Sequence, residues 1–443
     1  MKLNVKRTVL IGLGFMTIMM LWQVYNWQVP KFLEAHLSVM LNNASELVIG
    51  IIMALDNLLA IFMIPLMSNL SDKTRTKMGR RMPYIAVGIV LSAIAFVFLP
   101  WSNDTGNFWL LLINVFLVLV FMNIYRSPCV ALMPDITPKP LRSKGNSIIN
   151  IMGGVGFATG YLAITFFGNS IPWLPFVIVS AVMVIALFVL IAKVRENKFV
   201  EDYRAQLKEF GISEEEDKKE DVEEGGVKKT IKRNVILSLL IVFFAYMANN
   251  SVETFMSLYS KNIFGSVTGL PFNMEAGAFA MMPFGIATFV FALPAAIVAN
   301  KIGRAKTVML GAIVMCVSYV AIGLFGMTIG FNLALLVFFL TAGAGFAFIT
   351  INIYPMVVEN CSSRDVGRYT GYYYTASMVA QSVTPALCGL FLGFVSYNSL
   401  FPYATVFMLA VILVVCLLRK KKDKVEETET EPTEAQVTST EVE

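Results

Sequence analysis

Residues 68–84 read SNLSDKTRTKMGRRMPY, and the interpretation of the whole chain starts from this stretch. It gathers one acid, Asp72, and five cations: Lys73, Arg75, Lys77, Arg80 and Arg81. The rest of the chain has the opposite character, since 57% of the 443 residues are hydrophobic and only 15% are charged. A soluble domain is about a quarter charged, so this composition indicates an integral membrane protein.

Residue usage argues against several functional classes. The five cysteines are scattered without a CxxC pair, and His36 is the single histidine, so we expect no disulfide framework, no metal site and no cofactor. We attribute the net charge of +5 to membrane topology, and we expect no nucleic-acid partner. The apolar run after Arg7 lacks a small-residue cleavage site, which favours a retained first helix over a signal peptide. The chain leaves no room for a soluble catalytic domain, and we expect no enzyme activity.

Apolar runs long enough to cross a bilayer recur along nearly the whole chain. Hydropathy predicts twelve transmembrane helices, near residues 8–30, 45–70, 84–101, 108–133, 146–168, 172–194, 234–260, 276–299, 306–328, 331–357, 368–393 and 399–418. The predicted fold is therefore all-α and integral to the membrane. It has an N-terminal six-helix bundle in 1–194, a charged cytosolic linker in 195–233, a C-terminal six-helix bundle in 234–418 and a disordered cytosolic tail in 419–443.

Positive charge is distributed unevenly between the two predicted sides of the membrane. If the N-terminus is cytosolic, the lysines and arginines of the loops and termini lie almost all on the cytosolic side. The opposite side of the membrane would receive only Lys31 and Lys261. The positive-inside rule therefore predicts a multi-pass protein of the cell membrane with both termini in the cytosol.

The two predicted halves resemble each other along their length. Marker residues recur at separations of 224 to 229 residues, in the pairs Pro65/Pro294, Asp72/Asn300, Gly79/Gly303, Arg80/Arg304, Pro128/Pro355, Arg142/Arg368 and Gly145/Gly371. This nearly constant offset indicates internal duplication. Two related halves are typical of secondary transporters, in which two bundles rock about a central site.

Two interpretations of the charged loop remain open. In the first, its cations only fix topology by contact with anionic lipid headgroups. In the second, Asp72 accepts hydrogen bonds from arginines or from the N-terminus of another helix. The loop would then fasten the two bundles together on the cytosolic side and release them as they move apart.

Three blocks of sequence resemble a known family. The stretch from Pro65 to Tyr84 resembles the loop 2–3 signature of the major facilitator superfamily, in the lengthened form of glycoside–pentoside–hexuronide:cation symporters and sucrose-carrier-like proteins. NIYRSPCVALMPDITPKPLRSKGN from Asn123 and YPMVVENCSSRDVGRYTGYYY from Tyr354 resemble the paired helix 4 and helix 10 segments, and NKIGRAK at 300–306 is similar to the second loop copy. The resemblance implies two pseudo-symmetric six-helix bundles, alternating access and uptake of a sugar or glycoside with a proton or monovalent cation.

Carried over by position, the resemblance also implies a cytosolic gate. Its expected members are Asp72, Arg80, Arg81, Asp135, Arg142, Asn300, Arg304 and Arg368. Asn300 stands where the second copy often has an acid, so this gate is expected to be asymmetric.

Three charged residues, Asp56, Arg126 and Glu253, fall inside predicted spans. A charge at a helix centre costs about 2.5–3.5 kcal/mol on insertion scales, so each needs a function or a partner. In a functional interpretation, Asp56 or Glu253 carries the coupling proton, while Arg126 tunes that acid and holds substrate hydroxyls. In a structural interpretation, Asp56 and Arg126 form a buried pair that ties two helices together, and Glu253 is an acid near the water interface.

The sequence departs from the family pattern at the usual coupling positions. Ala60 and Ile64 replace the two acids that melibiose-type symporters carry before the second-span proline. Leu119 replaces the fourth-span acid of plant sucrose carriers. Coupling would therefore depend on Asp56 or Glu253, or would not occur.

Three predicted spans carry the amides, hydroxyls and aromatic rings that suit a sugar site. The expected cavity residues are Trp22, Gln23, Asn26 and Trp27 on the first span, Tyr246, Asn249 and Asn250 on the seventh, and Tyr373, Ser377 and Gln381 on the eleventh. For any one of them, an aromatic belt at the membrane interface or a polar packing contact is an equally simple alternative.

The leading hypothesis is a monomeric secondary active transporter that takes up a sugar or glycoside with a proton or cation. One alternative is an exporter of drugs or metabolites on the same scaffold. A hypothesis from a different class is a membrane sensor that binds a solute without transporting it.

Overall fold

A computed structural model of the chain describes residues 3–41, 44–211, 229–264, 274–359 and 366–418. These ranges are almost wholly helical, and within them the β-structure is limited to one isolated bridge between Thr76 and Gly79. The predicted all-α fold is confirmed. The tail predicted for 419–443 and residues 212–228 of the predicted linker lie outside the described residues.

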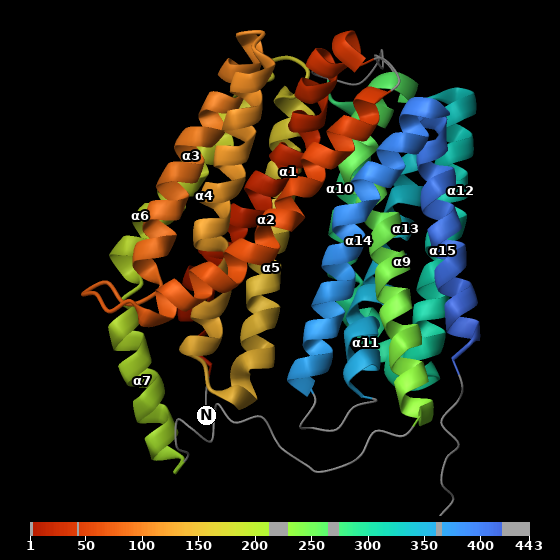
Figure 1. The fold of residues 1–443 in the computed structure, drawn as a ribbon. Coiled ribbons are helices and arrows are strands. Elements are labelled where there is room, and N and C mark those ends of the chain that lie inside the picture. Colours follow the sequence, from red (N-terminus) through yellow and green to blue (C-terminus); the bar gives the residue numbers. More distant parts are fainter. Residues whose placement is uncertain (1–2, 42–43, 212–228, 265–273, 360–365, 419–443) are drawn as a thin grey trace, which may run out of the picture.

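The helices fall into two sets of similar size (Figure 1). The first set comprises α1 (Val5–Leu41), α2 (Ser45–Lys73), α3 (Met82–Asp104), α4 (Phe108–Asp135), α5 (Lys139–Phe167) and α6 (Leu174–Lys193), followed by α7 (Glu196–Glu209). The second set comprises α9 (Lys229–Tyr259), the π-helical turn η2 (Ser260–Phe264), α10 (Ala276–Val290), α11 (Ala292–Ile302), α12 (Arg304–Ile329), α13 (Ala334–Val358), α14 (Val366–Phe394), the 3₁₀ turn η5 (Tyr397–Ser399) and α15 (Leu400–Cys416).

Eleven of the described helices are long and apolar enough to cross a membrane, and the bent pair α10 and α11 adds a twelfth if its two helices form one span. The two helices of this pair meet at 51°. Pro294 explains the break, because its ring nitrogen cannot donate to the carbonyl of Val290, the last residue of α10. Its repeat counterpart Pro65 lies within α2 without such a break.

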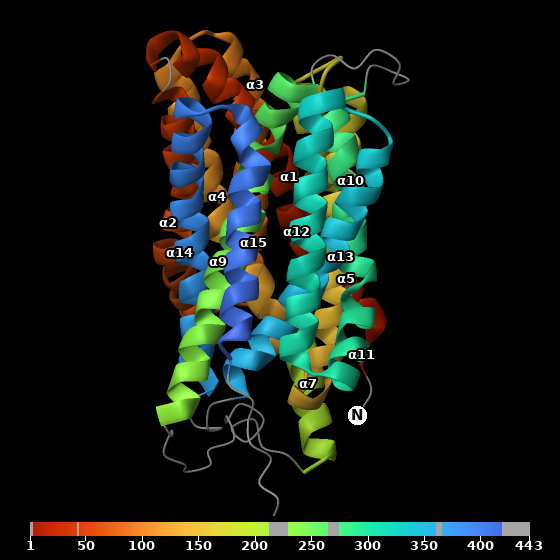
Figure 2. The ribbon, with the colours of Figure 1, turned by 90° about the vertical axis from the view of Figure 1, so that its right-hand side faces the viewer.

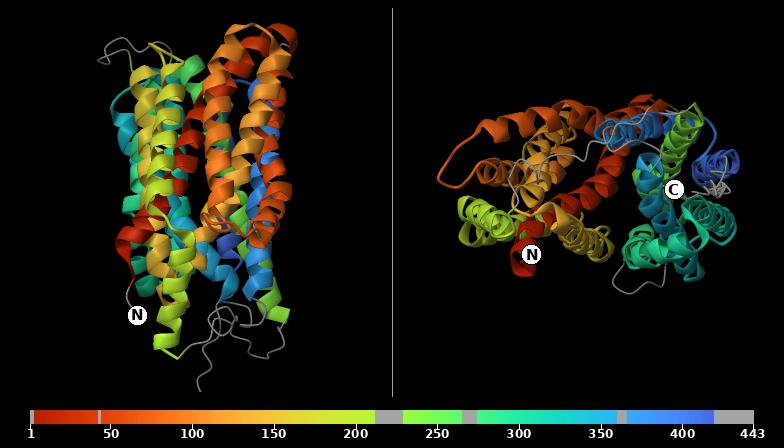
Figure 3. Two further views of the ribbon diagram at one scale, coloured as in Figure 1. Left: turned by 90° about the vertical axis from the view of Figure 1, so that its left-hand side faces the viewer. Right: turned by 90° about the horizontal axis from the view of Figure 1, so that it is seen from below.

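The two sets form two bundles side by side, as the view from below in Figure 3 makes plain. α1, α2 and α5 of the first bundle contact α9, α14 and α10 of the second. The α2–α14 and α5–α10 contacts are equivalent if the halves are exchanged, as expected for a pseudo-two-fold axis between α1 and α9. α1 begins and α15 ends at the same end of the molecule (Figure 2), as an even number of spans requires.

Glycines bring α2 and α14 into close contact near the end opposite to that at which α1 begins. A Cβ atom on Gly50 would lie 2.0 Å from the carbonyl oxygen of Pro385, and one on Gly389 would lie 2.2 Å from that of Glu46. Side chains at these positions would force the helices apart, so this inter-bundle contact depends on glycine.

Large apolar side chains are exposed all around the bundles. Phe188, Leu293, Val317 and Leu413 are each more than three-fifths exposed. On a helical bundle of this length such a surface is suited to lipid.

Candidate functional site

Asp56 has the other two charged residues predicted inside the membrane as its charged neighbours. Asp56 on α2 is 3% exposed, and its charged neighbours are Arg126 on α4 and Glu253 on α9. The amide of Asn123 and the hydroxyl of Tyr25 on α1 also lie near this carboxylate. Both bundles therefore contribute to one charged site, which we call the central site.

Arg126 contacts the aromatic ring of Trp22 and does not pair directly with the carboxylate of Asp56. Its guanidinium carbon lies 5.1 Å from the centroid of Trp22 on α1, within the range of a cation–π interaction. Among the described residues, the buried atoms Asp56 Oδ1 and Arg126 Nη1 have no hydrogen-bond partner. The direct Asp56–Arg126 ion pair of the structural alternative is therefore not formed.

Asn26 and Glu253 connect the two bundles at the central site. Asn26 Nδ2 donates to Glu253 Oε1 at 3.2 Å, and the two residues are 227 positions apart. This separation falls within the range of offsets of the internal repeat, as expected for a contact near the pseudo-two-fold axis between α1 and α9.

The remaining predicted cavity residues of α1 and α9 differ in their surroundings. Gln23 and Asn250 are buried, and within the described part of the chain Gln23 Oε1 and Asn250 Oδ1 have no partner. Asn249 is half-buried. Trp27 packs edge-on against Tyr161 of α5 at 6.0 Å, so it contributes to helix packing.

The predicted cavity residues of α14 lie next to α9 and α2. The hydroxyls of Tyr373 and Tyr246 are 3.3 Å apart, which joins α14 to α9. Ser377 and Gln381 donate to carbonyls of their own helix. Asn57 of α2 donates to the Gln381 carbonyl at 3.4 Å, so this face of α14 adjoins the helix that carries Asp56.

Ion pairs join the two bundles at the end opposite to that at which α1 begins. Lys31 of α1 lies 3.0 Å from Glu275, which precedes α10, and Lys261 of η2 lies 2.6 Å from Glu34 of α1. Glu34 and Lys261 are again 227 positions apart. We call this pair of ion pairs, together with Tyr397, the outer contact.

Tyr397 of η5 completes the outer contact. Its hydroxyl lies 2.7 Å from Glu46 Oε1 of α2 and 3.2 Å from Glu34 Oε1. Glu46 also accepts a hydrogen bond from Ser45 at 2.8 Å. Contacts of this group thus hold three helices and two turns together at this end.

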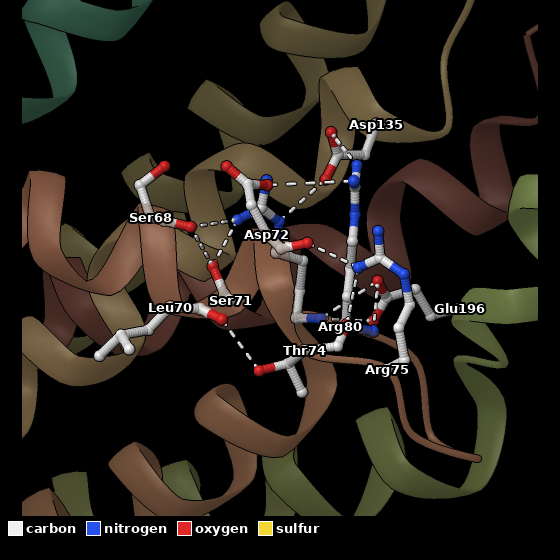
Figure 4. A network of polar contacts seen from close by, with 10 residues as sticks. Ser68, Leu70, Ser71, Asp72, Thr74, Arg75, Arg80, Asp135 and Glu196 are labelled. Carbon is white, nitrogen blue, oxygen red and sulfur yellow. Dashed lines mark hydrogen bonds and ion pairs between the residues drawn. The ribbon is translucent and has the colours of Figure 1, made fainter.

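The charged loop 68–84 forms a compact network at the opposite end (Figure 4). Arg80 lies 2.6 Å from Asp135 Oδ1, and Arg81 Nε donates to Asp135 Oδ2 at 2.9 Å. Arg81 also pairs with Asp72 and donates to Ser71. This arrangement brings together α2, α3 and the end of α4.

Glu196, the first residue of α7, caps the N-terminus of α3. Its carboxylate accepts hydrogen bonds from the backbone N–H groups of Arg80, Arg81 and Met82, at 2.9 to 3.1 Å. A carboxylate is favourable there because it satisfies unpaired N–H groups and faces the positive end of the helix dipole. Gly79, with φ of 115°, allows the close approach, since a Cβ atom there would lie 2.2 Å from Glu196 Oε2.

The rest of α7 docks on the first bundle through an amphipathic face. Tyr203 and Leu207 are buried, Arg7 of α1 pairs with Asp202, and its guanidinium lies 4.1 Å from the centroid of Phe199. The segment predicted as a linker therefore begins with a helix that belongs to the first half.

The contacts described for the charged loop lie within the first half. Asp72, Arg80 and Arg81 pair with one another and with Asp135, so the predicted contact of this loop with the second bundle is not formed in this conformation and stays a prediction. The physical reason is local, because Asp135 and Glu196 already provide the acids that these cations and the α3 N-terminus require.

The contacts of the other predicted gate residues also stay within one half or the other. Arg304 at the start of α12 pairs with Glu359 after α13 at 2.8 Å, and Asn300 is exposed at the end of α11. Arg142 donates to the Thr137 carbonyl, and Arg368 donates to Tyr372.

Comparison with known proteins assigns the family. The sequence model of the Major Facilitator Superfamily matches residues 8–286 and 268–442. The chain belongs to the major facilitator superfamily. No curated protein sequence matches it closely.

Solved structures of this superfamily's fold are similar over almost the whole chain. The inward-open xylose transporter XylE from E. coli has a TM-score of 0.69 at 16% identity and covers 94% of this chain and 97% of that one. A point mutant of the nucleoside transporter NupG has a TM-score of 0.65 at 15% identity, covering 94% of this chain and 100% of that one. A POT family transporter in complex with 5-aminolevulinic acid has a TM-score of 0.66 at 12% identity, covering 93% and 95%. At these identities the likeness shows the fold alone.

Membership of the major facilitator superfamily points to transport and away from enzymatic chemistry. The described residues contain no group of three or more His, Cys, Asp or Glu side chains that could hold a metal ion. What the fold does provide is a charged central site between two bundles, with an inter-bundle contact at one end and two intra-bundle networks at the other.

Sequence reasoning missed the acids of the outer contact and Glu196. Lys31 and Lys261 were noted only as exceptions to the charge asymmetry, although two isolated cations on a side that also carries Glu34, Glu46 and Glu275 were a signal for ion pairs. For α7, the spacing of Phe199, Tyr203 and Leu207 at every fourth position was a signal for a docked helix.

Proposed function

We propose that the protein is a secondary active transporter that takes up a sugar or glycoside together with a proton or monovalent cation by alternating access. One observation carries the proposal: the buried Asp56 has Arg126 of its own bundle and Glu253 of the other bundle as its charged neighbours. Charges are costly at this depth, and a charged site between movable bundles suits coupled transport.

The environment of the central site supports a polar organic substrate. Trp22 offers a flat ring, and Gln23, Asn26 and Asn250 offer amides. Such a mixture suits a sugar, whose ring has an apolar face and a rim of hydroxyls. These polar groups favour a sugar importer over an exporter of apolar drugs.

Asp56 is our candidate for the coupling acid. It is almost fully buried, and its charge is not neutralised by a direct ion pair. Glu253 accepts a hydrogen bond from Asn26 of the other bundle, so its environment would change when the bundles move relative to each other. We assign proton binding to Asp56 and treat Glu253 as its partner across the interface.

We further propose that the two ends act as alternating gates. The outer contact holds the bundles together in the present conformation. The loop network keeps Asp72 half-exposed, with 46% of its side chain accessible, so it is available to the second bundle when the outer end opens. In the cell membrane, the end with α7 and the first residues of α1 would face the cytosol, because it carries most of the lysines and arginines.

Uptake into proteoliposomes tests this proposal. With an imposed gradient that is acidic outside, the vesicles should accumulate a labelled glycoside, and an external pH electrode should record alkalinisation when glycoside is added without a gradient. Accumulation that is driven equally well with the gradient abolished by an ionophore would contradict coupling to protons. Binding of the glycoside to the purified protein without any uptake would support the sensor hypothesis instead.

A further inference from the structure

Acids outnumber cations at the outer contact. Its carboxylates are Glu34, Glu46 and Glu275, and its cations are Lys31 and Lys261. Lys31 lies 3.0 Å from Glu275 and Lys261 lies 2.6 Å from Glu34, so each cation already has an acid of its own. Glu46 is the acid that is left over, since it forms no ion pair within the described part of the chain.

Glu46 is also shielded from water. The residue is 8% exposed, and Gly389 of α14 packs so closely that a Cβ atom there would lie 2.2 Å from the Glu46 carbonyl oxygen. The partners described for its carboxylate are two neutral hydroxyls, those of Ser45 and Tyr397. An ionised carboxylate that is buried without a cation carries a large desolvation cost, and a proton on the carboxylate removes this cost.

Tyr397 contacts two carboxylates with a single hydroxyl proton. Its oxygen lies 2.7 Å from Glu46 Oε1 and 3.2 Å from Glu34 Oε1, and both distances suit hydrogen bonds. A tyrosine hydroxyl donates one hydrogen bond, and an ionised carboxylate donates none. With both acids ionised, one of the two contacts would lack a proton. With a proton on Glu46 both contacts are hydrogen bonds, because Glu46 donates to Tyr397 and Tyr397 donates to Glu34, which remains ionised opposite Lys261.

The elements packed against the outer end of α2 bring few other titratable or charged groups to Glu46. They are Lys31, Glu34 and His36 of α1, Lys261 of η2, Tyr397 of η5 and Cys388 of α14, and residues 108–124 of α4 contain none. The ring of His36 packs beside Phe108 of α4, with the centroids 6.3 Å apart, and Cys388 is a free, buried thiol. Only Glu34 and Tyr397 of this set are linked to Glu46 by described hydrogen bonds.

We propose that Glu46 is a second proton-binding site of this protein, which takes up a proton from the outer solution when the outer contact forms and releases it when the contact separates. The inference goes beyond the proposed function, which assigns the coupling proton to Asp56 in the central site. In the separated state, Glu46 meets water in the first turn of α2, where the positive end of the helix dipole favours an ionised carboxylate. Acid outside therefore favours the formed contact, and alkali outside favours the separated one.

Distances between spin labels at different pH values test this inference without any substrate. The labels replace Asp104 at the end of α3 and Leu333 before α13, which are exposed positions on different bundles, in the full-length chain without its native cysteines. The parent protein for every comparison also carries Asp56→Asn, so that a proton on the central site does not contribute. From about pH 5 to 8, the ratio of short to long distances should fall as the pH rises, by at most about tenfold per pH unit for a single proton.

Three variants of this parent identify the group that binds the proton. Glu46→Gln keeps the shape of the side chain without its charge, and it should hold the short distance at every pH. Glu275→Gln breaks the ion pair with Lys31, so it should raise the long-distance population yet retain the dependence on pH. His36→Gln is the matched control for the other nearby group that titrates in this range, and it should behave as the parent does.

Infrared spectroscopy detects the proton itself. A carboxylic acid and a carboxylate absorb at different frequencies, so the spectrum of the parent minus that of Glu46→Gln should contain the band of a protonated carboxyl group at acidic pH, where the contact is formed. A difference spectrum that contains only carboxylate bands would overturn the inference.

The outcomes separate this inference from the proposed function. Distances that do not change with pH in the parent, or that change equally in the parent and in Glu46→Gln, would overturn the proton site on Glu46 and leave coupled transport standing. A dependence on pH that is present with Asp56 and lost in the Asp56→Asn parent would assign the proton to the central site alone. A failure to take up any glycoside would contradict the proposed function without affecting these results, because no measurement here uses a substrate.

Discussion

The outer contact makes a prediction that follows directly from the geometry. Glu34→Gln keeps the shape of the side chain and its contacts with Tyr397 and Asn262 but removes the charge opposite Lys261. The protein should then populate an outward-open state more than the wild type does.

The magnitude follows from the exposure of the two partners. The Glu34 side chain is 10% exposed, but that of Lys261 is 51% exposed, so the lysine can be hydrated again when its partner is neutral. The loss should therefore lie between that of a surface pair, about 0.2–1 kcal/mol, and that of a broken buried pair, about 3–5 kcal/mol. We expect about 1–2 kcal/mol, a shift of about 5- to 30-fold in the conformational equilibrium.

Distances between spin labels at the outer ends of the bundles measure this shift. Asp104 at the end of α3 and Leu333 before α13 are exposed positions on different bundles, suited to cysteine labels in a variant without the native cysteines. Glu34→Gln should increase the long-distance population. Because the exchange Glu34→Lys with Lys261→Glu re-forms the ion pair with its charges reversed, it should restore most of the short-distance population. Identical distributions for Glu34→Gln and the wild type would refute the role of this ion pair.

Three further predictions concern the helix contacts. Glu196→Ala leaves the backbone N–H groups at the start of α3 without their acceptor, so the melting temperature in detergent should fall by several degrees, corresponding to about 1–3 kcal/mol; an unchanged melting curve would show that this cap is dispensable. Gly389→Val places a side chain against the Glu46 carbonyl and should destabilise the α2–α14 contact by about 1–3 kcal/mol. The measurement is a lower melting temperature than that of the control Gly371→Val, which lies at an open position. Equal effects of the two changes would contradict this packing argument. Asp72→Asn should slow transport turnover while KM changes little, and initial rates that match the wild type would return the loop to a purely topogenic role.

Much of the fold was predictable because hydropathy and charge act locally. A span needs about 20 apolar residues, and this requirement located most helices to within a few residues; the exceptions are the long α1, the start of α5, which lies at Lys139 where residue 146 was predicted, and the break in the eighth span. The break was not predicted, because Pro65 and Pro294 look alike in the sequence and only packing decides which helix bends. The repeat was predictable because duplicated turns keep their glycines and prolines.

The sites were less predictable because they depend on pairs distant in sequence. The sequence identified Asp56, Arg126 and Glu253 as unusual, yet it could not tell whether Asp56 and Arg126 would form a direct pair. The contacts of Asn26 with Glu253 and of Glu34 with Lys261 follow from the two-fold axis, which becomes useful only when the arrangement of the bundles is known. The sequence left the loop charges open to a topogenic or an inter-bundle role, and it gave no sign that Glu196 of the predicted linker reaches the start of α3.

The most direct test of the central claim compares Asp56→Asn with the wild type in two modes of transport. In proteoliposomes, an inward proton gradient should drive accumulation of labelled substrate by the wild type but not by Asp56→Asn, whereas exchange of internal for external substrate should persist in the variant. This result would place the coupling proton on Asp56 at the boundary between the bundles. Gradient-driven accumulation by Asp56→Asn at the rate of the wild type would contradict the account.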